Sequence, residues 1–252
     1  CSSDLLADVD TFRPDIGVIT NLSPDHLDRY SNLDAYYSDK ARIFNRAHAD
    51  SVWVLPAGDV VVQSLVAETP GTRFFFGELE HPGTHAFVAK SVLTLRTDGR
   101  SDDLVTTDEL PLLGRHNLAN ALAASITARL AGANLEGLRS GLRTALPLPH
   151  RLEPVADLGA VLWVNDSKAT NVAATRSALQ SLDRPVVLLV GGKDKGEDFS
   201  RLVPDGADVR AVIAYRDAGA RITSESSGSA MVAGGARGRR ATGGGRRPGD
   251  RK

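Results

Sequence analysis

The sequence of 252 residues has little of what marks secreted and membrane proteins. Cys1 is the single cysteine, which excludes an intramolecular disulfide and makes a reducing cytoplasm the expected compartment. No apolar run approaches the roughly 18 residues needed to cross a bilayer, so no membrane partner is expected. The chain opens without Met and without the regions of a signal peptide, which indicates a processed chain or one that begins mid-gene.

Several motifs of catalytic and metal-binding proteins are also missing. No Gly-x-x-x-x-Gly-Lys-Ser/Thr stretch occurs, so the sequence has no P-loop of its own to cradle nucleotide phosphates. It has neither the Gly-x-Ser-x-Gly turn of the α/β hydrolases nor a Cys/His zinc pattern. These two classes of protein are therefore excluded as interpretations.

The composition is that of a globular protein, with 42% hydrophobic and 24% charged residues. The net charge of -1 conceals a basic segment, 223–252, which carries about +5 by residue count and leaves roughly -6 for residues 1–222. This Gly/Arg-rich segment has almost nothing to bury, so we expect a disordered tail. An Arg-rich arm for nucleic acid is the alternative, but no aromatic residue alternates with the arginines. A shifted reading frame or a non-native terminus is the preferred interpretation, and no nucleic-acid partner is expected.

Short apolar runs alternate with helical patterns, which predicts an α/β architecture with largely parallel sheets. One helix is predicted over Asp34–Ala47. In another, leucine and isoleucine recur every four residues from Leu118 to Leu130, with Asn117 placed to cap the helix and Gly132 to end it. A Leu-Pro-Leu-Pro interruption predicts two domains, 1–147 and 148–222. The strands are expected at Ile16–Thr20, Val52–Leu55, Arg73–Phe76, Val161–Val164, Val186–Val190 and Val209–Tyr215.

Two candidate residues follow the first predicted strand. His26 lies between Asp25 and Asp28, carboxylates that could hold its imidazole neutral as a metal ligand or poise it as a base. Lys40 lies within the first predicted helix. Taken singly, such a histidine is more often a capping or surface residue, and such a lysine is usually a solvated one.

A third group surrounds the start of the second predicted helix. Gly114 allows a sharp turn, and His116, Asn117 and Asn120 follow it. Amide side chains at this place can hydrogen-bond a heteroaromatic ring, while the helix N-terminus favours negative charge. Plain helix capping is the alternative.

The fourth group consists of two loops that follow neighbouring predicted strands. Asn165–Asn171 carries Lys168, and Gly191–Gly196 carries Lys193 and Lys195. Paired glycines let backbone N–H groups approach an anion, and Lys, Ser and Thr beside a helix N-terminus suit carboxylates and phosphates. Spacing alone therefore predicts an anion-binding α/β protein, with nucleotide dependence as an open possibility.

Five stretches, taken in order, resemble the Mur ligase family over about residues 2–222. They read Asn-Leu-Ser-Pro-Asp-His-Leu-Asp-Arg-Tyr, Gly-Arg-His-Asn-Leu-Ala-Asn-Ala, Leu-Pro-His-Arg-Leu-Glu, Asn-Asp-Ser-Lys-Ala-Thr-Asn and Gly-Gly-Lys-Asp-Lys. The fourth of these is similar to the branch of the family that adds D-glutamate to UDP-N-acetylmuramoyl-L-alanine.

The resemblance implies a three-domain, monomeric enzyme of peptidoglycan precursor synthesis, with UDP-binding, ATPase and Rossmann-like domains. ATP would phosphorylate the carboxylate of UDP-N-acetylmuramoyl-L-alanine, and the amine of D-glutamate would displace the phosphate. Mg²⁺ and fixed cations would neutralise charge during phosphoryl transfer. Residues 1–147 would be part of the ATPase domain, and 148–222 part of the Rossmann-like domain.

The resemblance also implies residue roles. His26 and a carbamylated Lys40 would be magnesium ligands. Asn117 and Asn120 would contact the adenine of ATP. Arg151 would contact its phosphates, and Asp166 its ribose. Lys168 and Thr170 would belong to the loop that meets phosphate and D-glutamate, and Lys195 would bind a D-glutamate carboxylate.

The chain departs from the family pattern at both ends. It lacks the UDP-binding domain, the P-loop, an acidic magnesium ligand before Ser2 and the later Ser-Pro-Ala-Cys-Ala-Ser-type loop. We therefore expect a fragment that does not turn over ATP alone. Two alternatives stay open: another Mur or folyl-type amino-acid ligase, which a panel of amino acids would reveal, and a non-catalytic binding protein with an Arg-rich arm.

Overall fold

A computed structural model describes residues 6, 11–22, 30, 32–194, 196–226 and 231–234. The chain divides into two compact units, Cys1–Pro149 and His150–Lys252. This division lies two residues after the predicted domain boundary at 147/148.

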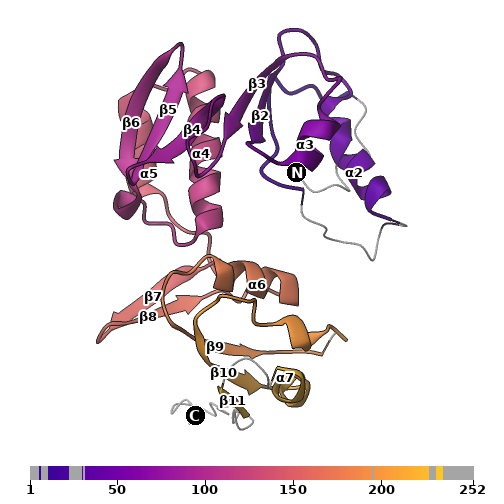
Figure 1. The fold of residues 1–252 in the computed structure, drawn as a ribbon, viewed down its shortest axis with the longest axis vertical. Coiled ribbons are helices and arrows are strands. Elements are labelled where there is room, and N and C mark those ends of the chain that lie inside the picture. Colours follow the sequence, from indigo (N-terminus) through magenta and orange to yellow (C-terminus); the bar gives the residue numbers. More distant parts are fainter. Residues whose placement is uncertain are drawn as a thin grey trace, which may run out of the picture. The chain divides into compact units, whose positions relative to one another are not determined.

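Unit 1 is built on one sheet of six strands, arranged in sequence order (Figure 1). The first four strands run parallel, and the last three form antiparallel pairs. The strands are β1 (Ile16–Val18), β2 (Val52–Pro56), β3 (Thr72–Phe76), β4 (Thr84–Ala89), β5 (Val92–Thr97) and β6 (Arg100–Thr106).

Three of the five strand pairs of this sheet are parallel, as predicted, but its antiparallel half was not predicted. Two tight turns produce it, at Lys90–Ser91 and at Asp98–Gly99, and all four residues have φ between 50° and 73°. Paired left-handed residues are what a two-residue hairpin turn requires. Asp-Gly is a common sequence for such a turn, but Lys-Ser is not, and no strand was predicted on either side of these turns.

The helices of unit 1 differ from the predicted ones at their ends. The first ends at Ala41 and continues as a short 3₁₀ turn, Arg42–Phe44, instead of reaching Ala47. In α4, Gly114 occupies the N-cap position, and the Asn117 side chain instead donates a hydrogen bond to the Leu113 carbonyl at 2.7 Å. The prediction that Asn117 caps this helix is therefore wrong. The helices are α2 (Leu33–Ala41), α3 (Val60–Leu65), α4 (Arg115–Leu130) and α5 (Leu135–Thr144).

The core of unit 1 lies on both faces of its sheet. Along β2, Val54 points to the cluster that contains Leu122 and Ile126 of α4, whereas Trp53 and Leu55 point to the cluster beneath α2 and α3. Alternate side chains of a strand face opposite sides of a sheet, so a strand buried on both sides is a continuous apolar run. This arrangement explains why β2 was readable from the sequence.

Unit 2 contains a parallel three-stranded sheet, in the order β11-β10-β9, and a separate antiparallel pair, β7-β8 (Figure 1). We expected Val161–Val164 to belong to the same pattern of strands as Val186–Val190, but β8 pairs with β7. The elements are β7 (Glu153–Leu158), β8 (Val161–Asn165), α6 (Val172–Gln180), β9 (Val186–Gly191), the 3₁₀ turn η3 (Phe199–Arg201), β10 (Val209–Tyr215), α7 (Gly219–Glu225) and β11 (Met231–Gly234).

The predicted disordered tail begins too early at Thr223. Helix α7 continues through Glu225, with Ile222 buried in the core of unit 2, and Met231–Gly234 pairs in parallel with β10. The short apolar run at 231–233 supplies the strand, although glycine and serine surround it. Residues 235–252 lie outside the described residues.

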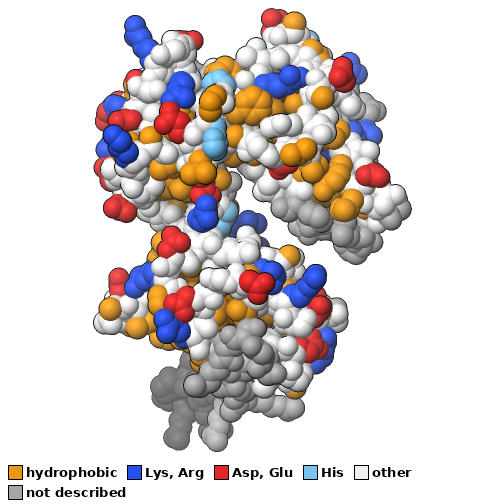
Figure 2. All heavy atoms as spheres, in the orientation of Figure 1, with side chains coloured by type: hydrophobic (Ala, Val, Ile, Leu, Met, Phe, Trp, Pro, Cys, Tyr) orange, Lys and Arg blue, Asp and Glu red, His pale blue; other side chains and the backbone are white. Residues whose placement is uncertain are grey.

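Helices that could span a membrane were sought in the described residues, and none is both long and apolar enough. On the face shown in Figure 2, acidic and basic side chains are intermingled over the described surface of each unit.

Candidate ligand pocket in the second unit

The pocket of interest in unit 2 has a volume of about 230 Å³ and lies where the loop before α6 meets the end of β9. Its apolar wall comes from Phe199, Leu202 and residues of β9 and α7. The polar lining combines hydroxyl, amide, ammonium and carboxylate groups: Ser167, Thr170, Asn171, Thr175, Lys193 and Glu197. The structure thus brings together the two loops that the sequence singled out for anion binding.

The two glycines at the end of β9 have different structural roles. A Cβ atom on Gly191 would lie 2.1 Å from the backbone oxygen of Tyr215, so close contact with β10 requires a glycine there. Gly192 has a φ of +148° and open space around its Cα, so its backbone conformation is what favours glycine. Strand packing at Gly191 and backbone conformation at Gly192 thus explain the two glycines, and the approach of their N–H groups to an anion stays a prediction.

The N-terminus of α6 is already engaged by side chains of the protein. Asn171 caps the helix by accepting a hydrogen bond from the Ala174 N–H at 2.7 Å. The Glu197 carboxylate accepts another from the Val172 N–H at 2.6 Å. Carboxylates at this position are stabilised by the helix dipole. Glu197 was not predicted, because it lies 25 residues from its partner and no local pattern marks it.

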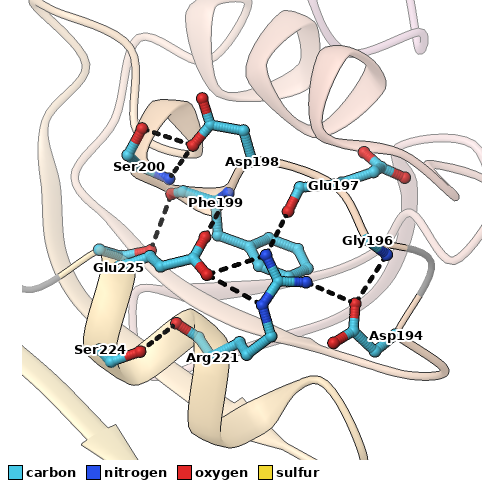
Figure 3. A network of polar contacts seen from close by, with 10 residues as sticks. Asp194, Gly196, Glu197, Asp198, Phe199, Ser200, Arg221, Ser224 and Glu225 are labelled. Atoms are coloured by element: carbon cyan, nitrogen blue, oxygen red, sulfur yellow. Dashed lines mark hydrogen bonds and ion pairs between the residues drawn. The ribbon is translucent and has the colours of Figure 1, made fainter.

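Arg221 of α7 fixes the loop that carries Glu197 (Figure 3). Its guanidinium donates to the Asp194 carboxylate at 2.8 Å, to the Glu225 carboxylate at 2.8 and 2.9 Å, and to the Glu197 carbonyl at 2.9 Å. The same group lies 5.3 Å from the centre of the Phe199 ring. One side chain therefore contacts both ends of the segment 194–199.

The charges in this network favour their ionised forms. A hydrogen bond from the Gly196 N–H, and then one from Arg221, lower the pKa of Asp194 below its ordinary value. The hydrogen bonds with Asp194 and Glu225 raise the pKa of Arg221 in turn. The ion pair between Asp194 and Arg221 therefore persists over a wider pH range than the two groups would give without these hydrogen bonds.

The predicted residues before the pocket lie around the start of the β7-β8 hairpin. The Asp166 carboxylate accepts a hydrogen bond from the Leu152 N–H at 3.1 Å, and the Lys168 N–H donates to the His150 carbonyl at 3.0 Å. These contacts bring the backbone on either side of Arg151 beside the loop of Asp166 and Lys168. The side chains of Arg151 and Lys168 are exposed, and Thr170 lies in the pocket lining.

The remaining described candidates belong to unit 1. Asn117 and Asn120 lie in the first two turns of α4, Asn120 with its side chain exposed. The Lys40 ammonium lies 5.6 Å from the centre of the Tyr36 ring on the same helix. His26 and Lys195 lie outside the described residues.

The described residues do not by themselves form a magnesium site. In the part of the chain that the structure describes, no three His, Cys, Asp or Glu side chains gather where they could hold a metal ion. Lys40 contacts an aromatic ring, and the proposed partner ligand, His26, is not among the described residues. The metal site therefore stays a prediction from the family resemblance.

Comparison with known families assigns both units. The Mur ligase middle domain matches residues 2–128, and the Mur ligase glutamate ligase domain matches residues 150–242. The chain therefore belongs to the Mur ligase family, as its five motifs predicted.

Curated relatives carry the name of one particular ligase of this family. A protein of Salinibacter ruber is 41% identical over 235 residues, and one of Acidobacterium capsulatum is 37% identical over 231 residues. Both are named UDP-N-acetylmuramoylalanine--D-glutamate ligase. The matches cover 91% and 90% of this chain but 51% and 50% of the relatives, so the chain spans about half the length of these proteins.

Solved structures of the family share the fold. MurF from Acinetobacter baumannii superposes with a TM-score of 0.63 at 19% identity, over 88% of this chain and 50% of that one. UDP-N-acetylmuramate-alanine ligase MurC from Thermotoga maritima gives 0.61 at 19% identity, over 89% and 52% of the two chains. At this identity the likeness concerns architecture alone, and it agrees with the α/β fold described above.

Proposed function

We propose that the chain carries part of an ATP-dependent ligase that joins D-glutamate to UDP-N-acetylmuramoyl-L-alanine through an acyl phosphate. The observation that carries this proposal is the 41% identity, over nine-tenths of the chain, to a ligase of that name. Such an enzyme acts in peptidoglycan synthesis in the cytoplasm, and through it in cell shape and division. We propose a monomer, with these three substrates as its partners.

The pocket of unit 2 is the proposed site for D-glutamate. Its volume is below the roughly 300–1,000 Å³ of pockets that take drug-sized ligands, so an amino acid is a better match. Lys193 and Thr170 can hold a carboxylate by charge and by a hydroxyl hydrogen bond. The Glu197 carboxylate repels a second anion at the α6 N-terminus, which favours placing the ammonium group of the amino acid on that side.

The remaining roles rest on the family resemblance. Asn117 and Asn120 would contact the adenine, Asp166 the ribose and Arg151 the phosphates of ATP. Lys168 would neutralise charge on the transferred phosphoryl group, and Lys195 would hold a D-glutamate carboxylate. Mg²⁺, when held by His26 and carbamylated Lys40, supplies further positive charge to the phosphates.

A titration of the 252-residue chain with amino acids tests the D-glutamate site. We expect D-glutamate to shift the amide NMR signals of Thr170 and Lys193, and L-glutamate at equal concentration to shift them less. Lys193→Gln should raise the dissociation constant for D-glutamate by roughly ten- to a hundredfold, because a hydrogen bond to a charged group contributes roughly 1.5–3 kcal/mol.

The matched control is Lys90→Gln, the same replacement at a turn of unit 1, which should leave the dissociation constant unchanged. Equal losses in both variants would contradict the assignment. Preferential binding of a different amino acid would favour the alternative, a ligase of the same family with another substrate.

A further inference from the structure

The described residues of the loop between β9 and η3 belong to no helix or strand, yet this loop forms one wall of the pocket. Lys193, Glu197 and Phe199 line the pocket. Lys193, Glu197 and the backbone around them belong to neither a helix nor a strand. The conformation of this wall therefore depends on side-chain contacts with other elements.

Arg221 provides contacts at both ends of the wall (Figure 3). At one end its guanidinium binds Asp194, whose carboxylate also accepts the Gly196 N–H at 2.8 Å. At the other end it binds the Glu197 carbonyl and stacks near the Phe199 ring. An arginine fork that makes several charge-assisted hydrogen bonds at once fixes geometry better than a lone surface ion pair does.

Glu225 completes the attachment from the same helix. One of its carboxylate oxygens accepts from Arg221, and the other accepts from the Phe199 N–H at 3.0 Å. The Ser226 hydroxyl donates to the Phe199 carbonyl at 3.1 Å. Helix α7 therefore binds the loop through Arg221 and Glu225, which lie on consecutive turns of the helix, four residues apart.

The contacts continue from the loop to the other wall of the pocket. Glu197, whose carbonyl is bound by Arg221, places its carboxylate on the Val172 N–H at the start of α6. The residues just before Val172 are the predicted anion loop. A displacement of Glu197 would therefore disturb both loops that line the pocket.

We propose that Arg221 is a positioning residue, which clamps Asp194 and the segment 196–199 and thereby preorganises the pocket for an amino-acid carboxylate before the ligand arrives. The ligand named here rests on the proposed function, whereas the clamp does not. No role for this residue follows from the motifs of the sequence, because α7 lies beyond the last of them.

The test compares Arg221→Gln with Arg210→Gln in the full chain. Arg210 is a suitable control, because it is exposed and its guanidinium pairs with Asp208 at 2.7 Å, outside both loops of the pocket. Amide hydrogen exchange of Val172 and Phe199, measured by NMR without ligand, reports on the clamp. Amides of Leu188 and Val212, in the sheet, report on the fold of unit 2.

We expect Arg221→Gln to speed exchange at Val172 and Phe199 about tenfold, with the sheet amides and the Arg210→Gln protein unchanged. The D-glutamate dissociation constant should rise about tenfold if the loop is competent a tenth of the time, since apparent affinity scales with the competent fraction. Arg221→Lys keeps the charge but loses the forked hydrogen bonds, so its exchange rates and dissociation constant should lie between those of the unaltered chain and those of Arg221→Gln. It replaces Arg221→Gln in the test if that variant does not fold.

Loop exchange as slow in both Arg221 variants as in the unaltered chain would overturn the clamp. So would equal acceleration in Arg210→Gln. If the unaltered chain does not bind D-glutamate, the proposed function fails, and the exchange measurement still decides the role of Arg221.

Discussion

Two apolar strands, β2 in unit 1 and β9 in unit 2, are similar in sequence and differ in burial. In β2, Trp53 and Leu55 are 1% and 0% exposed, because β2 is a central strand covered by helices on both faces. In β9, Val187 and Leu189 are 52% and 53% exposed, and β9 lies at the edge of its sheet. A continuous apolar run thus predicts a strand but does not predict how deeply its two faces are buried.

The two units also differ in what fixes their shape. Unit 1 is organised around apolar contacts between α4 and its sheet, whereas the pocket of unit 2 is shaped by hydrogen bonds and charges around Arg221. Apolar burial involves no titrating charge and is not weakened by charge screening, whereas a partly exposed ion pair is weakened by added salt and by a pH at which one partner loses its charge. The two units should therefore respond differently to the same perturbation.

The largest expected difference is between matched leucine substitutions. Leu55→Ala should lower the free energy of unfolding of unit 1 by about 3 kcal/mol, because a fully buried leucine leaves a cavity. Leu189→Ala should lower that of unit 2 by less than about 1 kcal/mol, because half of its side chain already contacts water.

The two tryptophans allow each unit to be followed in one urea titration. Trp53 belongs to unit 1 and Trp163 to unit 2, so their indole N–H signals report separately. Equal losses for the two leucine variants would show that the exposed face of β9 is covered in solution.

A smaller effect is expected from the helix caps. Asn134 accepts a hydrogen bond from the Gly137 N–H in α5, and Asn171 accepts one from the Ala174 N–H in α6, each at 2.7 Å. Replacing either by alanine should lower the stability of its own unit by about 1 kcal/mol. Only Asn171→Ala should also weaken D-glutamate binding, because Asn171 lines the pocket. Loss of binding in both variants would mean that global stability, and not the pocket, controls affinity.

The smallest effect is a difference in pH dependence. Burial, and then the nearby Arg96, lower the pKa of His85 in unit 1 below its ordinary 6.5. The folded state therefore binds this proton less tightly than the unfolded state, and unit 1 loses stability as pH falls from about 6.5 through the lowered pKa. His85→Gln should flatten this part of the profile.

In unit 2 the change should come at lower pH. The pKa of Asp194 is below its ordinary 3.8, so the stability from its contacts is present above that value and lost as pH falls through the lowered pKa. Thermal unfolding between pH 3 and 8, followed through the two indole signals, measures both. A decline of both units over the same pH range would contradict the comparison.

The fold was predictable where local pattern and burial agree. Strands β2, β3, β9 and β10 were predicted within one residue at each end, because each is largely apolar and is set off by glycine, proline or polar residues. The hairpins of β4, β5 and β6 were missed, because β6 is polar along much of its length and the Lys90–Ser91 turn has no residue that favours positive φ. These strands form because they pair with one another and pack in the sheet, which the local sequence does not indicate.

The site was predictable only in its local motifs. The loops around Thr170 and Lys193 do meet in one pocket, although the strands that they follow belong to different sheets, because β8 pairs with β7 and β9 pairs with β10. Glu197 and Arg221 were missed, because their partners lie 24 to 27 residues away along the chain. The Arg221–Glu225 spacing of four residues was visible, but it predicts a solvated helical ion pair as readily as a clamp.

The contact between Gly191 and Tyr215 bears on how mutational tolerance is interpreted for this chain. Because the β10 backbone occupies the space of a side chain at position 191, a library randomised there and selected only for folding should return glycine alone. Gly192 meets no neighbouring atoms, so its tolerance depends on backbone strain alone. A failure to accept substitutions at position 191 would then reflect the packing of β9 against β10, and not ligand binding. At position 192, the difference between the residues accepted with and without selection for ligand binding would show what the ligand requires.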